Sequence, residues 1–138
     1  MNTMDNRDWV YFGVFLDDKS RAKLYALTKT VVDDTWRVFC HHMTIAFNNN
    51  SKAARDMFDK YADKFGTEVE LVATHLGISD DAIAVKVPYA GETLNKFPHI
   101  TLATPANGRP VNSNYITTWH ELDKPIKLKG IFNVFKKQ

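Results

Sequence analysis

The chain has 138 residues, of which 44% are hydrophobic and 25% charged, a composition typical of one soluble globular domain spanning residues 1–138. Its formal net charge of +2 is too small for a surface that coats DNA, so stable DNA binding is not expected. The single cysteine, Cys40, excludes an internal disulfide and is typical of a reducing compartment. Residues 1–8 are polar and no stretch approaches the roughly 18 apolar residues of a membrane helix, so we expect a cytoplasmic protein with no membrane partner.

The first half of the chain is predicted to alternate strands with helices. Aromatic and β-branched residues predict a strand over residues 9–16, and the two aspartates that follow signal the start of an amphipathic helix over residues 19–30. A second strand is expected over residues 39–47. A second helix is expected over residues 53–65, after a turn at residues 48–51, Asn-Asn-Asn-Ser, that offers an N-cap.

The second half is predicted to consist mainly of strands. Residues 67–79 alternate apolar and polar side chains, and they form a hairpin with residues 82–87. The other expected elements are a loop over 88–97, a strand over 98–103, a loop over 105–114, a turn or short helix over 115–119, and a strand over 126–135 with Gly130 as a candidate bulge. This order predicts an α+β fold with a largely antiparallel sheet.

One short motif occurs twice. Residues 42–46 read His-Met-Thr-Ile-Ala, and residues 99–103 read His-Ile-Thr-Leu-Ala. Because side chains on a strand alternate between faces, the histidine, threonine and alanine of each copy are expected on one face. The intervening apolar residues, and Phe47 after the first copy, are expected on the other. Two such strands side by side would present two imidazoles and two hydroxyls to one point, from His42, Thr44, His99 and Thr101.

These four side chains suit the cleavage of a phosphodiester. A neutral imidazole removes a proton from water or a ribose hydroxyl, and a protonated one gives a proton to the leaving oxygen; each such group typically contributes about 10²–10⁴ in rate. Threonine hydroxyls donate hydrogen bonds to the non-bridging oxygens. This chemistry needs no metal and no cofactor. Since the motifs are alike, the sequence leaves open which histidine is the acid and which is the base.

With these two His-x-Thr motifs the chain resembles the 2H phosphoesterase superfamily, the LigT-like group, and within it the RNA-repair-like and phage-type branch. The resemblance implies a bilobal fold of two pseudo-symmetric antiparallel sheet lobes with flanking helices and a central cleft. It implies hydrolysis of a 2′,3′-cyclic phosphate or of a 2′–5′ or 3′–5′ linkage in an RNA-derived or cyclic (oligo)nucleotide. Such a reaction serves RNA-end repair or, in phage enzymes, the anti-CBASS degradation of nucleotide immune signals. We expect a monomer or weak dimer that binds a nucleotide or an RNA end.

Six further side chains are candidates for substrate binding, and each has an ordinary alternative. Tyr11 on the first strand is equally suited to the core, and Trp119 is either a stacking platform or a core lid. Lys86 either faces the phosphate or is a solvated strand lysine. The remaining three either read a base edge or a ribose or form a simple turn: Asn112, Ser113 and Asn114.

His41, which precedes the first motif, is expected to have a different role. Alternation places it on the face opposite His42, so a structural role is expected. Cys40, His41 and His42 diverge for the same reason, and no carboxylate or second cysteine has ligand spacing nearby, so no metal site is expected. Functions of two other classes remain alternatives: a nucleotide- or RNA-binding module without turnover, and a structural interaction domain.

Overall fold

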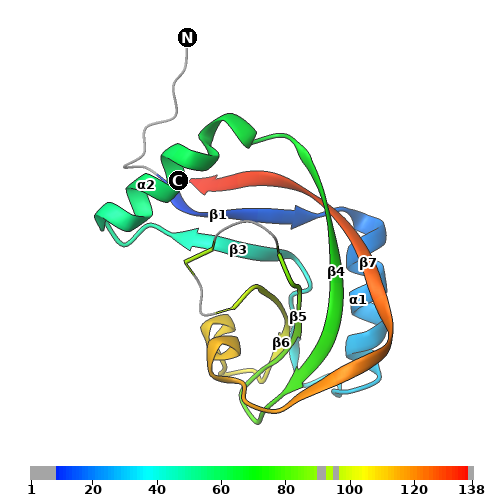
Figure 1. The fold of residues 1–138 in the computed structure, drawn as a ribbon. Coiled ribbons are helices and arrows are strands. Elements are labelled where there is room, and N and C mark those ends of the chain that lie inside the picture. Colours follow the sequence, from blue (N-terminus) through cyan, green and yellow to red (C-terminus); the bar gives the residue numbers. More distant parts are fainter. Residues whose placement is uncertain (1–8, 90–92, 95–96, 137–138) are drawn as a thin grey trace.

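The computed structural model describes residues 9–89, 93–94 and 97–136 (Figure 1). More of these residues lie in strands than in helices, and helices α1 and α2 come early in the chain. In chain order the elements are β1 (Trp9–Leu16), α1 (Asp18–Lys29), β2 (Arg37–Val38), β3 (His42–Phe47), α2 (Lys52–Tyr61), the 3-10 helix η1 (Ala62–Lys64), β4 (Glu68–Ile78), β5 (Ile83–Lys86), β6 (His99–Thr104), the 3-10 helix η2 (Pro110–Tyr115) and β7 (Trp119–Lys136).

The strands form one antiparallel sheet that closes on itself. The strand order is β2-β6-β3-β1-β7-β4-β5, and β5 also pairs with β6. The strands from β6 through β3, β1, β7 and β4 to β5 therefore make a barrel-like ring, with β2 paired to β6 beside it. Figure 1 shows the long strands β4 and β7 curving around one side of the ring, with α1 behind β7. The result is a mixed α/β fold, as the predicted α+β class requires.

Local signals explain where the two α-helices begin. The carboxylate of Asp17 accepts a hydrogen bond of 2.8 Å from the backbone N–H of Ser20, which caps α1 and lowers the pKa of Asp17. The hydroxyl of Ser51 accepts one of 3.1 Å from the N–H of Ala54 and caps α2 in the same way. Among the described residues, no helix has the length and apolar character that crossing a membrane requires.

The hydrophobic core lies between the sheet and the two helices. The ring of Phe58 on α2 stacks on Trp9 of β1, with 5.1 Å between the ring centroids. Full burial of an apolar side chain of this size contributes about 1.5–3 kcal/mol, so the core fixes any strand that supplies several of them. The two motif strands supply four fully buried ones: Met43, Ile45, Ile100 and Leu102.

Several element boundaries differ from the sequence-based expectations. Strand β3 begins at His42 rather than at residue 39, because Cys40 has a φ of 49°, a left-handed conformation that interrupts extended backbone. The 3-10 helix η2 occupies part of the expected loop at 105–114. Strand β7 begins at Trp119, where a turn or short helix was expected, and runs for 18 residues.

Gly130 is not a bulge. Its pairing with Leu16 of β1 and with Val69 of β4 is in continuous register. A Cβ at this position would lie 2.6 Å from the carbonyl oxygen of Phe15. The glycine therefore allows β1 and β7 to approach closely.

Candidate active site

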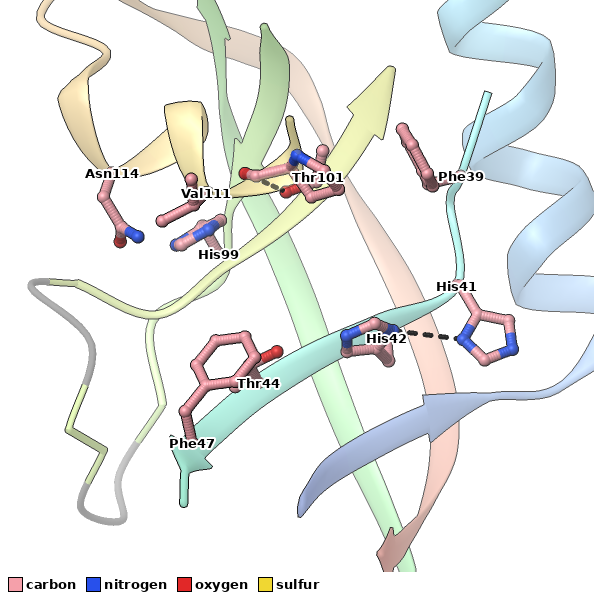
Figure 2. A pocket seen from close by; sticks show the side chains of 10 residues that line it. Phe39, His41, His42, Thr44, Phe47, His99, Thr101, Val111 and Asn114 are labelled. Carbon is pink, nitrogen blue, oxygen red and sulfur yellow. Dashed lines mark hydrogen bonds between the residues drawn. The ribbon is translucent and has the colours of Figure 1, made fainter. Parts of the chain in front are cut away.

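The two His-x-Thr motifs lie side by side in the sheet. Met43 of β3 pairs with Ile100 of β6 in antiparallel register, so the motifs run in opposite directions around this pair. The histidine of each motif therefore lies on the side of the other motif's threonine, as Figure 2 shows. The apolar centres of both motifs point into the core, and their polar side chains point into a shared pocket.

The pocket collects side chains from three parts of the chain. The segment that leads into β3, together with β3 itself, forms one wall, and β6 with η2 forms the other (Figure 2). All four residues expected to be catalytic line this pocket, together with Asn114 from the substrate-binding candidates. The lining consists of Phe39, His41, His42, Thr44, Phe47, His99, Thr101, Pro110, Val111 and Asn114.

Strand β3 carries a β-bulge directly after its threonine. Thr44 pairs with Gly13 of β1, and Ala46 pairs with Phe12, so the pairing passes over Ile45. An extra residue of this kind reverses the face of every side chain beyond it.

Strand β6 repeats this irregularity at the corresponding position. Thr101 pairs with Ala84 of β5, and Ala103 pairs with Ile83, so the pairing passes over Leu102. The motifs thus share a backbone feature as well as a sequence, and both bulges lie at the pocket, where bulges commonly re-aim side chains.

The bulges contradict part of the expected alternation. The expectation that each alanine shares the face of its histidine and threonine is wrong, because Ala46 and Ala103 are both 0% exposed in the core. The expectation for Phe47 is wrong as well. Its side chain is 50% exposed and lines the pocket, so an aromatic ring stands at the rim where an apolar core residue was expected.

His99 is held by a backbone carbonyl. The side chain is 7% exposed, and its Nδ1 lies 3.0 Å from the carbonyl oxygen of Phe97. A carbonyl only accepts, so Nδ1 carries a proton and the neutral ring has its lone pair on Nε2. Burial lowers the pKa of His99, and the hydrogen bond to Phe97 opposes that shift.

His42 is held by aromatic rings and by another histidine. Its ring stacks on Tyr11 and on Phe15, with centroid separations of 4.7 and 5.4 Å. Its Nδ1 lies 3.0 Å from Nδ1 of His41. Burial, the neighbouring His41 and, to a smaller extent, His99 lower the pKa of His42 to about 4. The ring is therefore neutral at neutral pH.

The expectation that His41 points away from His42 is wrong. His41 lines the same pocket, and its ring meets that of His42 edge to face at an interplanar angle of 85°. Strict alternation holds only within a strand, and His41 lies before the start of β3, directly after the left-handed residue Cys40. Positive φ at a non-glycine residue is the feature that the sequence did not reveal.

The hydroxyl of Thr101 belongs to a small network with η2. It lies 2.8 Å from the Oγ of Ser113, which is fully buried, and it donates a longer bond of 3.3 Å to the carbonyl oxygen of Pro110. Ser113 therefore contacts a pocket residue from behind. Thr44, on the opposite wall, is 8% exposed.

Three substrate-binding candidates lie beside the pocket and do not line it. The ring of Tyr11 stacks on that of His42 and also on that of Phe135, the latter at 5.3 Å. Lys86 is the cross-strand partner of His99, but its ammonium lies over the ring of Trp119, 4.7 Å from the centroid. Trp119 in turn donates its indole N–H to the carbonyl oxygen of Ile116.

Asn112, Ser113 and Asn114 lie in the 3-10 helix η2 rather than in a simple turn, and Asn114 reaches the pocket. The N–H of Asn112 donates to the carbonyl oxygen of Arg109 within η2. Asn114 lines the pocket, and its Oδ1 is buried without a hydrogen-bond partner. Two further lining residues, Pro110 and Val111, were not predicted; a proline suited to the first turn of a helix was the available signal.

Comparison with known proteins gives a likeness of fold. No protein-family model and no curated protein matches the chain. Among solved structures, the fold is similar to a chain of the crystal structure of a fungal RNA kinase, with a TM-score of 0.68 and 16% sequence identity. The match covers 98% of this chain and 47% of that chain, so this chain spans about half the length of its structural neighbour.

The described part of the chain contains no group of three or more histidine, cysteine, aspartate or glutamate side chains placed to hold a metal ion. The pocket histidines have other partners: a carbonyl for His99, and each other for His41 and His42.

Proposed function

We propose that the chain is a metal-independent phosphodiesterase of the 2H type, which hydrolyses a 2′,3′-cyclic phosphate or a 2′–5′ or 3′–5′ linkage in an RNA-derived or cyclic (oligo)nucleotide. One observation carries the proposal. Two motifs far apart in the sequence line a single pocket with two imidazoles and two hydroxyls, from His42, His99, Thr44 and Thr101.

In the proposed reaction one histidine is the base and the other is the acid. The base takes a proton from water as the water oxygen bonds to phosphorus. The P–O bond to the leaving ribose oxygen breaks, and the acid gives that oxygen its proton. Thr44 and Thr101 donate hydrogen bonds to the non-bridging oxygens, where negative charge develops.

The mechanism requires one protonated histidine, and the negative charge of the substrate favours that form. The pKa values of both histidines are lowered by burial, so both are neutral at neutral pH. A phosphate anion next to a buried imidazole favours its protonated form. Binding of a phosphodiester thus raises the pKa of the nearer histidine, which takes up a proton from solvent and becomes the acid.

The remaining candidates are proposed either to contact the substrate or to support the catalytic side chains. Asn114 has a buried amide oxygen without a partner, which suits an N–H donor on a base edge. Tyr11 and Ser113 support His42 and Thr101 from outside the pocket. Asn112, Lys86 and Trp119 are proposed to meet a longer substrate beside the pocket.

We also propose that the closed sheet is the two-lobed 2H fold, with one motif in each lobe. The β-bulges that follow Thr44 and Thr101 support this, since they repeat the same irregularity in two strands. The likeness to a structure described as a fungal RNA kinase makes RNA ends the first substrates to test. Cyclic oligonucleotide signals, the substrates of anti-CBASS enzymes, come second.

The test is a substrate panel assayed in EDTA, with products identified by mass. It includes 2′,3′-cyclic nucleotides, RNA ending in a 2′,3′-cyclic phosphate, 2′–5′ and 3′–5′ dinucleotides and cyclic dinucleotides. We expect turnover of at least one class, loss in His42→Ala and His99→Ala, and no change in His120→Ala, a variant of an exposed histidine outside the pocket. Binding without product would identify a nucleotide-binding module. No binding at all would favour a structural domain.

A further inference from the structure

The two pocket histidines have different partners at the same atom. Nδ1 of His99 meets a backbone carbonyl, that of Phe97, at 3.0 Å. Nδ1 of His42 meets Nδ1 of His41, also at 3.0 Å (Figure 2). In each case Nε2 lies on the far side of the ring from the partner. His41 thus occupies, for one histidine, the position that a carbonyl occupies for the other.

His41 is held firmly enough to act as such a partner. Its carbonyl oxygen accepts a hydrogen bond of 3.0 Å from the N–H of Leu16. The preceding carbonyl, of Cys40, accepts one of 3.3 Å from the side chain of Arg21 on α1. The ring of Phe15 packs against that of His41 edge to face, at 5.4 Å. Two hydrogen bonds therefore fix the backbone at His41, and the Phe15 ring fixes the orientation of its side chain.

Two imidazoles that meet through Nδ1 share one proton between those atoms. Whichever ring donates has its other nitrogen free to act as a base in the neutral form. The carbonyl of Phe97 forces His99 to donate from Nδ1. For His42 to donate from Nδ1 in the same way, Nδ1 of His41 must accept the hydrogen bond. The proton of a neutral His41 then lies on its Nε2.

We propose that His41 is the positioning residue for His42: its Nδ1 lone pair accepts the Nδ1–H of His42 and keeps Nε2 of His42 available to the reacting atoms. This inference rests on the proposed function for its catalytic consequence, but not for its geometry. It holds for either role of His42, because the Nδ1–H is present whether the ring is neutral or protonated.

The surroundings of His41 agree with an accepting role. The charged group that faces it is the guanidinium of Arg21 on α1, and the other contacts are the rings of Phe15 and His42. Burial, followed by the charge of Arg21, lowers the pKa of His41. A neutral His41 has a lone pair to offer, whereas a protonated one does not. Unlike the carbonyl that holds His99, this acceptor is therefore lost in acid.

The direct test is the tautomer of His42, read from the ¹⁵N shifts of the imidazoles at neutral pH. We expect the proton of His42 on Nδ1 in the wild type, a mixture of Nδ1–H and Nε2–H in His41→Ala, and restoration in His41→Asn, whose amide oxygen can accept. His99 should keep its tautomer throughout. His120→Ala is the control for loss of an exposed histidine. Thermal unfolding of each variant shows whether it is folded.

Kinetics supply a second readout. We expect kcat to fall roughly 10- to 100-fold in His41→Ala, as when a partner that orients a functional histidine is removed, with little change in KM and recovery in His41→Asn. A wild-type His42 protonated on Nε2, or a His42 tautomer unchanged by His41→Ala, would overturn the inference. If the tautomer shifts as expected but the wild type cleaves no substrate, the phosphodiesterase proposal fails and the positioning role stands.

Discussion

Thr101 Oγ1 and Ser113 Oγ lie 2.8 Å apart and join the second motif to η2. Thr101 has a single hydroxyl proton, which it donates to the carbonyl oxygen of Pro110 over a long 3.3 Å. If Ser113 donates to Thr101, that proton can turn from Pro110 toward a bound phosphate without breaking the shorter bond. The network therefore holds the Thr101 side chain in place and still lets its hydroxyl donate to a bound phosphate instead of to Pro110.

Loss of either hydroxyl of this hydrogen bond should lower the free energy of unfolding. Loss of both should lower it by less than the sum of the two single losses. Thr101→Val leaves the fully buried Ser113 hydroxyl without its partner, which costs about 1–3 kcal/mol of unfolding free energy. Ser113→Ala, combined with it in a double-mutant cycle, should show coupling of at least about 0.5 kcal/mol in urea unfolding. Strict additivity would contradict the contact. Turnover should fall in Thr101→Val more than in Ser113→Ala, since only the former loses a phosphate donor.

Stability should decrease in mild acid because of His42. Its pKa is about 4 in the folded chain against an ordinary 6.5, so between these values the unfolded chain binds a proton that the folded chain does not. The free energy of unfolding should therefore fall as pH drops from about 6.5 to about 4, by roughly 3 kcal/mol from this group. Urea unfolding at several pH values measures the slope. His42→Ala should make the slope shallower, and part of it should remain because the pKa values of His41 and His99 are lowered as well.

Gly13→Ala should disturb the first motif. A Cβ at Gly13 would clash with the carbonyl oxygen of Met43, so β1 and β3 must separate next to Thr44. We expect a loss of about 1–3 kcal/mol in stability and a lower kcat. Gly66→Ala is the comparison: its φ is +92°, but nothing lies within 4 Å of the added Cβ. It should cost about 1 kcal/mol and leave turnover unchanged.

The anchor of the second motif can be tested with two isoleucines. Ile100 is 0% exposed, and Ile131 is 44% exposed. Ile100→Ala should lower the free energy of unfolding by about 2–5 kcal/mol, through lost burial and a cavity between the motif strands. Ile131→Ala should change it by less than about 1 kcal/mol. Chemical denaturation compares the two, and equal losses would show that Ile100 is not a core anchor.

Features that depend on neighbouring residues were predictable from the sequence. The caps Asp17 and Ser51 use side chains within three residues of the amides they bind. The four motif side chains were expected in one place, and the structure brings them to one pocket. Their chemical roles stay predictions.

Features that depend on distant partners were not predictable. For α1 the sequence predicted an amphipathic helix, but it does not show which side chains of the helix are buried, and Tyr25 is 47% exposed. The helix buries Leu24 together with two polar residues, Ser20 and Thr28. The Ser20 hydroxyl accepts a hydrogen bond of 2.7 Å from the backbone N–H of Lys129, and the Thr28 hydroxyl donates one of 2.8 Å to the carbonyl oxygen of Leu24. The bulges, the face of Phe47 and the direction of His41 likewise follow from strand pairings and from one backbone angle that the local sequence does not encode.

The junction between the motif strands also has a consequence for motion. In the described residues, Met43 and Ile100 are the one register pair of β3 with β6, and the segment before β3 adds two backbone hydrogen bonds, from Phe39 to Leu102 and from Cys40 to Thr101, whereas β4 and β7 are paired along most of their length. A ring opens most easily where it has the fewest ladder bonds. Backbone amides next to this junction should therefore exchange with solvent before those of β4 and β7. We therefore expect the pocket to change its width more readily than the β4–β7 side of the sheet does.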